Sequence, residues 1–138
     1  MQVFVIWEST RGRTKAMAEA VCDGIKEAGG NCNLVEARDF QNLDGACAVA
    51  VGSSTRMKRP LPKVRQILGE IGGLDGKPVA AFGSYGWSGE APDEISNLLI
   101  DAGGNPVIEH PIKAKDYPGE DALQKCRDLG KSLTDACK

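Results

Sequence analysis

The alternation of short apolar runs with stretches of helical periodicity constrains the fold of this chain more than any other feature. Three runs, residues 3–7, 46–51 and 79–82, are apolar throughout, which is typical of strands covered on both faces. Between such runs, apolar residues recur at three- and four-residue steps, as Met17, Val21 and Ile25 do. These steps mark one face of a helix. The alternation predicts a parallel sheet with right-handed helical crossovers.

Two weaker strands complete the predicted sheet. Residues 33–36 and 106–109 mix polar and apolar side chains, and the second segment includes a proline, as edge strands do. Three buried strands and two edges, second and fifth in sequence, predict an α/β fold. Its doubly wound five-stranded parallel sheet has the order 2-1-3-4-5, with helices on both faces. The expected helices cover residues 17–28, 61–71, 95–102 and 122–133.

Composition and charge limit the classes of protein to which the chain can belong. With 138 residues, 41% hydrophobic and 26% charged, it has the balance of one compact domain, expected to span residues 1–138. Met1 directly before the first strand indicates a stand-alone domain. A net charge of −2 argues against general nucleic-acid binding, and no apolar run approaches the roughly 18 residues of a membrane span. Because no signal-peptide core is present either, we expect a cytoplasmic protein that binds neither nucleic acid nor membrane.

The five cysteines and the single histidine, His110, do not form a metal-binding pattern. No two cysteines have C-x-x-C spacing, and one histidine makes a Cys/His zinc site implausible. In a cytoplasmic protein, an odd number of cysteines predicts reduced, mostly buried thiols. We expect His110 at the surface.

The segment 9–14 (STRGRT) lies between the first strand and the first helix. Backbone N–H groups at a helix N-terminus favour an anion, and Ser9, Thr10 and Thr14 add hydroxyl donors. Gly12 permits a left-handed turn or a close approach. An ordinary Ser/Thr cap with a turn glycine explains the same residues. The loop alone therefore leaves both a phosphate site and a plain helix cap open.

Other phosphate-site patterns are missing from the chain. It has no G-x-x-x-x-G-K-[ST] for a nucleoside triphosphate and no G-x-G-x-x-G for a dinucleotide. The expected strand ends lack the aspartates of a phosphoacceptor site, and the first loop lacks a cysteine nucleophile. A cradle for a single phosphate group remains.

The segment 83–89 follows the fourth expected strand and places two aromatic residues among three glycines. Tyr85 and Trp87 offer flat faces for stacking, while the glycines let backbone N–H groups approach a ring edge. One of the two aromatics could instead pack beneath a neighbouring loop. Packing alone explains both of them poorly, so we expect a planar ligand at this edge.

Residues 81–89 (AFGSYGWSG), together with the segments 9–14 and 52–55 (GSST), resemble the flavodoxin family. They are especially similar to the flavodoxin-like domain of flavodiiron proteins. The resemblance covers nearly the whole chain and implies bound FMN, with its phosphate in the first loop and its ring at the third. The residues it assigns to FMN are Ser9, Thr10, Arg11, Gly12, Arg13, Thr14, Ser53, Ser54, Thr55, Arg56, Met57, Ser84, Tyr85, Gly86, Trp87 and Gly89.

Two stretches depart from the family pattern. Arg13 stands where asparagine is usual, and Arg11 where a hydroxyl or aromatic residue is common. For each of these two arginines there are two alternatives: it pairs with the FMN phosphate, or it points to solvent. Residues 56–59 (RMKR) bring three cations to the flavin edge and no aromatic, leaving Met57 to contact the ring. We expect these cations to raise the reduction potential of bound FMN, or to dock an acidic redox partner or a flat anionic substrate.

The resemblance implies an electron-transfer protein, a flavodoxin, that shuttles electrons between redox partner proteins of ferredoxin, rubredoxin or flavodiiron type. We expect a monomer or weak dimer with no catalytic residues and no metal, because FMN itself performs the electron chemistry. An FMN-dependent NAD(P)H reductase acting on a quinone-type acceptor is the alternative. A flavodoxin-like scaffold that has lost flavin is a third, weaker reading.

Overall fold

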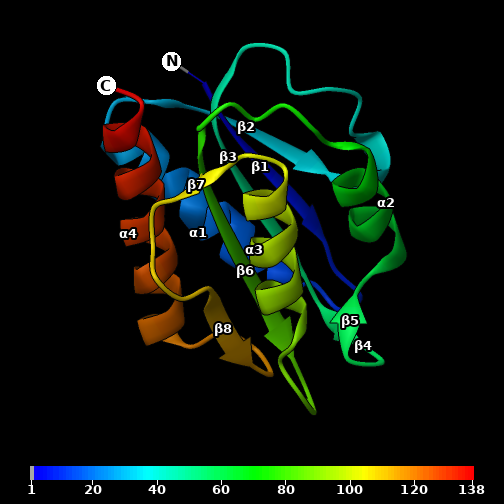
Figure 1. The fold of residues 1–138 in the computed structure, drawn as a ribbon. Helices are drawn as coiled ribbons and strands as arrows, with labels where there is room; N and C mark the ends of the chain where they lie inside the picture. Colours follow the sequence, from blue (N-terminus) through cyan, green and yellow to red (C-terminus); the bar gives the residue numbers. More distant parts are fainter. Residues whose placement is uncertain (1) are drawn as a thin grey trace.

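The structure, a computed structural model, describes residues 2–138 as one sheet with helices on both faces (Figure 1). No helix in this range is long and apolar enough to cross a membrane. The elements are, in chain order, β1 (Gln2–Glu8), α1 (Arg13–Glu27), β2 (Asn31–Glu36), the 3-10 helix η1 (Ala37–Asp39), β3 (Ala46–Ser53), β4 (Thr55–Arg56), β5 (Arg59–Pro60), α2 (Pro62–Glu70), β6 (Pro78–Tyr85), α3 (Ala91–Asp101), β7 (Asn105–Pro106), β8 (Ile112–Lys115) and α4 (Glu120–Ala136).

The strand order confirms the predicted topology. The main sheet runs β2-β1-β3-β6-β7, and β8 also pairs with β6. Every pairing in this sheet is parallel. Val5 of β1, for example, lies opposite Leu34 of β2 on one side and Ala50 of β3 on the other. Because β7 and β8 together occupy the place of the fifth strand, the order is 2-1-3-4-5.

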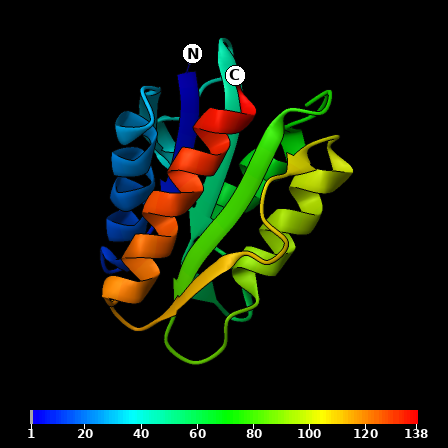
Figure 2. The same cartoon turned by 90° about the vertical axis from the view of Figure 1, so that its left-hand side faces the viewer.

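The two faces of the sheet carry separate hydrophobic layers. Successive side chains of a strand point to opposite faces. Val3 and Val5 therefore pack in the layer beneath α1 and α4, whereas Phe4 and Ile6 pack beneath α2 and α3. Figure 2 shows α1 and α4 side by side over one face, with α3 on the other. The carboxyl ends of the strands are left at one edge between the two layers.

The prediction of a fifth strand at residues 106–109 is wrong in its position. Pairing with β6 begins at Asn105, stops after Val107, and resumes only at Ile112, which lies opposite Phe82. In β8 the buried Ile112 and Ala114 alternate with exposed lysines, which is the period-2 pattern of a strand with one covered face. The segment 108–110, with a half-buried Ile108 followed by two exposed residues, carries no such pattern. It includes His110, which is at the surface as expected.

Helices α1 and α4 approach each other through two glycines. A Cβ atom on Gly24 would lie 1.9 Å from the Arg127 carbonyl oxygen, and one on Gly130 would lie 2.1 Å from the Val21 carbonyl oxygen. Both neighbours are backbone atoms, so no side-chain rotation can relieve the overlap. The two helices can lie this close only because both positions are glycine.

We predict that Gly130→Ala lowers the free energy of unfolding by about 2 kcal/mol or more, because the helices must move apart. Gly69→Ala is the matched control. Gly69 also lies in a helix, but nothing lies within 4 Å of its added Cβ, so the better helix propensity of alanine should stabilise that variant by up to about 1 kcal/mol. Urea unfolding of both variants is the measurement. Equal stabilities would contradict the close helix packing.

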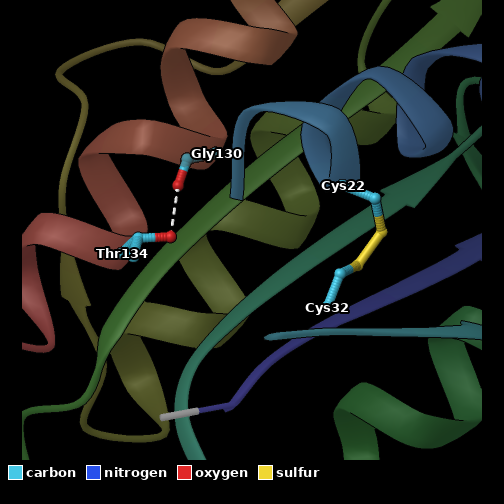
Figure 3. Close-up of a disulfide and its surroundings, with 4 residues drawn as sticks. All are labelled: Cys22, Cys32, Gly130 and Thr134. Carbon is cyan, nitrogen blue, oxygen red and sulfur yellow. Dashed lines mark hydrogen bonds between the residues drawn. A yellow bond between two sulfur atoms is a disulfide. The ribbon is translucent and has the colours of Figure 1, made fainter. Parts of the chain in front are cut away.

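The prediction of five reduced cysteines is wrong in the structure. Cys22 of α1 is bonded to Cys32 of β2 (Figure 3), and Cys47 of β3 is bonded to Cys137 after α4. Their Cα atoms lie 5.4 and 5.7 Å apart, within the range that a disulfide spans. The bonded cysteines are 10 and 90 positions apart in the sequence, and only the fold brings them together. The spacing of the cysteines therefore could not predict these pairs. Cys126 is buried and free.

Burial raises the pKa of the Cys126 thiol to about 12, although Arg127 partly opposes the shift. Since the thiolate is the reactive form, the native protein should resist iodoacetamide at pH 8 and react only as the pH approaches that pKa. Unfolding without a reductant should then expose one reactive thiol, and unfolding with a reductant five. Mass spectrometry counts the labels. Five labels without reductant would rule out both disulfides.

Candidate cofactor site at the carboxyl edge of the sheet

The carboxyl ends of β1, β3, β6 and β8 meet at one edge of the molecule, at the bottom of Figure 1. The parallel register brings them together: Glu8 of β1 pairs with Ser53 of β3, and Tyr85 of β6 with Lys115 of β8. All the predicted site residues lie at these strand ends or in the segments that follow them, up to the first turn of α1. The structure therefore brings the three predicted loops to the same edge, where doubly wound sheets bind ligands.

A buried group of three hydroxyls joins the loops. Thr14 at the start of α1 has its Oγ1 2.8 Å from the Ser84 Oγ of β6 and 3.2 Å from the Ser54 Oγ that follows β3. All three residues are buried. Their hydroxyls therefore bond to one another and fix the relative positions of the loops. Their side chains are therefore engaged within the protein and are not free at the surface.

The first loop leaves the N-terminus of α1 without a side-chain cap. Gly12 takes the N-cap position with φ 79°, in the left-handed region, and its N–H donates to the Ser9 Oγ over 2.9 Å. The first turn of α1 contains no acidic residue. The free N–H groups of that turn and the helix dipole favour an anion there. Thr10 and Arg11 are exposed beside this turn.

The two unusual arginines differ in their surroundings. Arg13 does not point freely to solvent, since its Nη1 lies 3.7 Å from Asp116 Oδ1 and its side chain is 27% exposed. A Cβ on Gly86 would lie 3.9 Å from both of these atoms. Arg13 therefore links the first loop to the third loop and to the end of β8. Arg11 is exposed and forms no ion pair with any residue in 2–138.

The second loop is anchored at its start. Ser53 is fully buried, and its Oγ donates to the Ser54 carbonyl and accepts the Leu61 N–H, both over 2.8 Å. Thr55 Oγ1 accepts the Ala91 N–H over 3.2 Å. The side chains of Ser53 and Thr55 thus hold α2 and α3 in place beneath the site.

A two-residue hairpin that the sequence analysis did not predict presents residues 56–59. β4 and β5 pair antiparallel, Arg56 lies opposite Arg59, and Met57 and Lys58 form the turn with φ 52° and 65°. Such a turn normally uses Asn or Gly, because other residues are strained in the left-handed region. Arg59 donates to Glu94 from Nε and Nη2 over 3.2 and 2.6 Å, which raises the pKa of its guanidinium. The tight turn and this ion pair hold the hairpin in place.

The two aromatics of the third loop take different positions. The ring of Tyr85 lies against Gly89, where an added Cβ would come within 2.9 Å of it, so Tyr85 packs on its own loop. Trp87 is 95% exposed. Gly83 passes so close to β3 that a Cβ would lie 2.1 Å from the Ser53 carbonyl oxygen. The loop therefore offers one free aromatic face on a closely packed base.

The sequence model of the flavodoxin family matches residues 5–130. The chain belongs to the flavodoxin family. It is 33% identical to an anaerobic nitric oxide reductase flavorubredoxin of Vibrio vulnificus over 96% of its own length and 28% of that protein's. A similar protein of Aeromonas salmonicida is 36% identical, with 96% and 27% coverage. The chain thus spans less than a third of these curated relatives.

Solved structures agree with membership of the flavodoxin family. A flavodoxin from the domain Archaea has a TM-score of 0.91 at 34% identity, and each chain is covered to 99%. The rubredoxin oxygen:oxidoreductase of Desulfovibrio gigas also has a TM-score of 0.91, at 26% identity, with 99% of this chain and 36% of that one covered. The predicted resemblance to flavodoxins and flavodiiron proteins is confirmed.

Three groups at the edge of this flavodoxin-family site were missed in the sequence. Glu8 Oε1 accepts the Val64 N–H over 2.8 Å and so caps α2. Asp116 and the 66% exposed Tyr117 follow β8 and border the site beside Arg13. The alternation in residues 112–115 is the signal that could have placed Asp116 and Tyr117 at this edge.

The site residues fit FMN at both of its ends. The uncapped start of α1 beside Arg11 and Arg13 fits a phosphate dianion. At the end of the third loop, Glu90 Oε1 is buried and has no hydrogen-bond partner within residues 2–138. A ligand that brings an N–H donor, as the flavin ring does, would satisfy that oxygen.

Two hollows away from this edge fit FMN less well. They have volumes of about 320 and 350 Å³ and flank the loop 39–44. The charged residues that line them, Asp39 and Asp44 in one and Glu70 in the other, are all acidic. Acidic side chains repel a phosphate dianion. The carboxyl edge is therefore the better site despite its shallowness.

We predict that Thr14→Val, which keeps the shape of the side chain, lowers the free energy of unfolding by about 1–3 kcal/mol. The change leaves the buried hydroxyls of Ser54 and Ser84 without their shared partner. Thr14→Ser keeps the hydroxyl, and its free energy of unfolding should therefore fall by less than that of Thr14→Val. Urea unfolding compares the two, and equal losses would show that the hydroxyl contacts contribute nothing.

Proposed function

We propose that this flavodoxin-family chain binds FMN and carries electrons between redox proteins. The observation that carries the proposal is the meeting of an uncapped, cation-flanked helix N-terminus and an exposed tryptophan at one edge of the sheet. The first feature suits the phosphate of a flavin mononucleotide, and the second suits the ring. Family membership supports FMN over other ligands with a phosphate and a ring.

In the proposed complex, each loop has a separate task. Ser9, Thr10, Gly12 and the first-turn N–H groups of α1 hold the phosphate, with Arg11 beside them. The backbone of residues 53–56 lines the middle of the cofactor. Met57, Gly86 and Trp87 contact the ring, and Tyr85 with Gly89 supports that contact from beneath. FMN supplies the one- and two-electron chemistry, and the chain binds it, orients it and sets its potential.

Binding of FMN against riboflavin tests the proposal, because riboflavin has the ring and lacks the phosphate. Charge-assisted hydrogen bonds to the phosphate should make FMN bind at least about tenfold more tightly. Arg11→Gln should reduce that preference and leave the affinity for riboflavin unchanged. Flavin fluorescence quenching measures both affinities. Equal affinities for the two flavins, or no binding of either, would refute the proposal.

The cations of the second loop should raise the reduction potential of bound FMN, because they stabilise the more negative reduced form. Arg56→Gln removes a charge that has no ion-pair partner among residues 2–138, and it should lower the potential. The double variant Arg59→Gln/Glu94→Gln removes an ion pair without changing the net charge, and it should leave the potential nearly unchanged. Redox titration measures the shifts. Equal potentials for all three proteins would show that the loop has no electrostatic role.

An electron carrier and an NAD(P)H reductase differ in whether they oxidise NADH or NADPH in repeated cycles. The names of the relatives, flavorubredoxin and rubredoxin oxygen:oxidoreductase, support protein partners of rubredoxin or flavodiiron type, and ferredoxin-type proteins remain candidates. Rapid oxidation of NADH or NADPH by the FMN-loaded protein would instead identify an NAD(P)H:acceptor reductase, with the basic hairpin binding an anionic substrate. Electron exchange with small redox proteins alone identifies the carrier.

We further propose that residues 1–138 form one FMN-binding domain, a monomer or weak dimer, that works in the cytoplasm. The two disulfides argue against a cytoplasmic location in most organisms, because disulfides are rare in the cytosol outside hyperthermophiles. Rapid acid trapping of cells followed by thiol labelling shows whether the bonds exist where the protein works.

A further inference from the structure

The carboxyl edge carries an exposed apolar surface. Met57, Trp87 and Tyr117 are 90, 95 and 66% exposed, and they come from the β4–β5 hairpin, the loop after β6 and the segment after β8. The other exposed large apolar side chains among residues 2–138, Leu34 and Ile100, are only 39 and 44% exposed and lie on other elements. The most exposed apolar groups therefore gather where the flavin ring is proposed to lie.

The same edge has an excess of unpaired positive charge. Three of its carboxylates form ion pairs: Asp116 with Arg13, Glu94 with Arg59 and Asp93 with Lys113. Glu8 accepts a backbone N–H of α2, and Glu90 is half-buried. The exposed cations Arg11, Arg56, Lys58 and Lys115 form no ion pair within residues 2–138. The edge therefore presents cations that pair with no carboxylate among residues 2–138, although the whole chain has a net charge of −2.

The hairpin geometry separates the cations by task. Arg13 and Arg59 are held in ion pairs and support the loops. Lys58 occupies the tip of the strained two-residue turn and Arg56 its first strand, and both side chains are exposed. A turn of fixed shape presents these charges around the apolar groups at little entropic cost.

We propose that Arg56 and Lys58, with Met57, Trp87 and Tyr117, form the docking surface for an acidic electron-transfer protein. The inference rests on the proposed electron-carrier function and names the chemistry of its partner. Cations beside exposed apolar side chains complement a partner with carboxylates around its redox centre, and such complementarity steers association. Contact at this edge brings that centre next to the proposed flavin ring.

The test measures electron transfer from a reduced, acidic [2Fe–2S] ferredoxin to the oxidised, FMN-loaded protein, from about 0.01 M to about 1 M ionic strength. The second-order rate constant should fall about tenfold or more across this range. Lys58→Glu should lower it by a similar factor at low salt and flatten the salt dependence. Lys26→Glu is the matched control, because Lys26 is an exposed lysine in the last turn of α1, at the opposite end of that helix from the first loop.

Equal rate constants for the Lys58→Glu and Lys26→Glu variants, or tighter binding of the basic protein cytochrome c than of the ferredoxin, would overturn the docking proposal. Calorimetry of the FMN-free chain with the same ferredoxin tests the surface even where FMN does not bind. If the chain shows no flavin absorption after incubation with FMN, the proposed function is refuted. If the chain binds FMN but does not bind the ferredoxin, only the docking surface is refuted. Tighter binding to vesicles of anionic lipid than to the ferredoxin would assign the cations to a membrane instead.

Discussion

The hydroxyl of Thr14 lies within hydrogen-bond reach of Ser84 and Ser54, and the arrangement of the site depends on these two buried contacts. They join the start of α1 to β6 and to the end of β3. Without them the loops would be held by the register of the strands below and by the more exposed Arg13–Asp116 ion pair. Parallel pairing brings the loops to one edge, and the hydroxyl group fixes them there relative to one another.

This scaffold explains why so few of the predicted site side chains are free to touch a ligand. Thr14, Ser53, Ser54 and Ser84 are buried in contacts within the protein. Backbone donors at a helix N-terminus are well suited to a phosphate, because they carry partial charge in a fixed direction. The side chains left exposed are mainly cationic or apolar. A cofactor held by backbone groups would leave those side chains available to a partner.

The fold could be predicted from the sequence, because the spacing of apolar residues and the continuous apolar runs directly reflect which side chains are buried. Residues 46–51 and 79–82 lie in the central strands, and the order 2-1-3-4-5 followed from which strands read as edges. The fifth strand was misplaced because Pro106 suggested an edge, whereas the clearer alternation lay in residues 112–115. Features that depend on distant contacts could not be predicted. The Cys47–Cys137 bond and the close approach of Gly24 to Arg127 join residues about ninety or more positions apart.

For the site, the sequence predicted that the three loops meet at one edge of the sheet, as they do in the structure, but it could not assign tasks within them. The ion pairs of Arg13 with Asp116 and of Arg59 with Glu94 decide which cations are structural, and both join loops to other elements. The hairpin at Met57 and Lys58 was missed because its turn contains neither glycine nor asparagine.

The central claim is that FMN binds at the carboxyl edge between the first and third loops. Amide chemical-shift mapping by NMR during titration with FMN tests this most directly, because each backbone N–H reports its own surroundings. The account predicts that the largest shifts fall on residues 9–15 and 83–90. Shifts concentrated on residues 39–44, which line the acidic hollows, would contradict it.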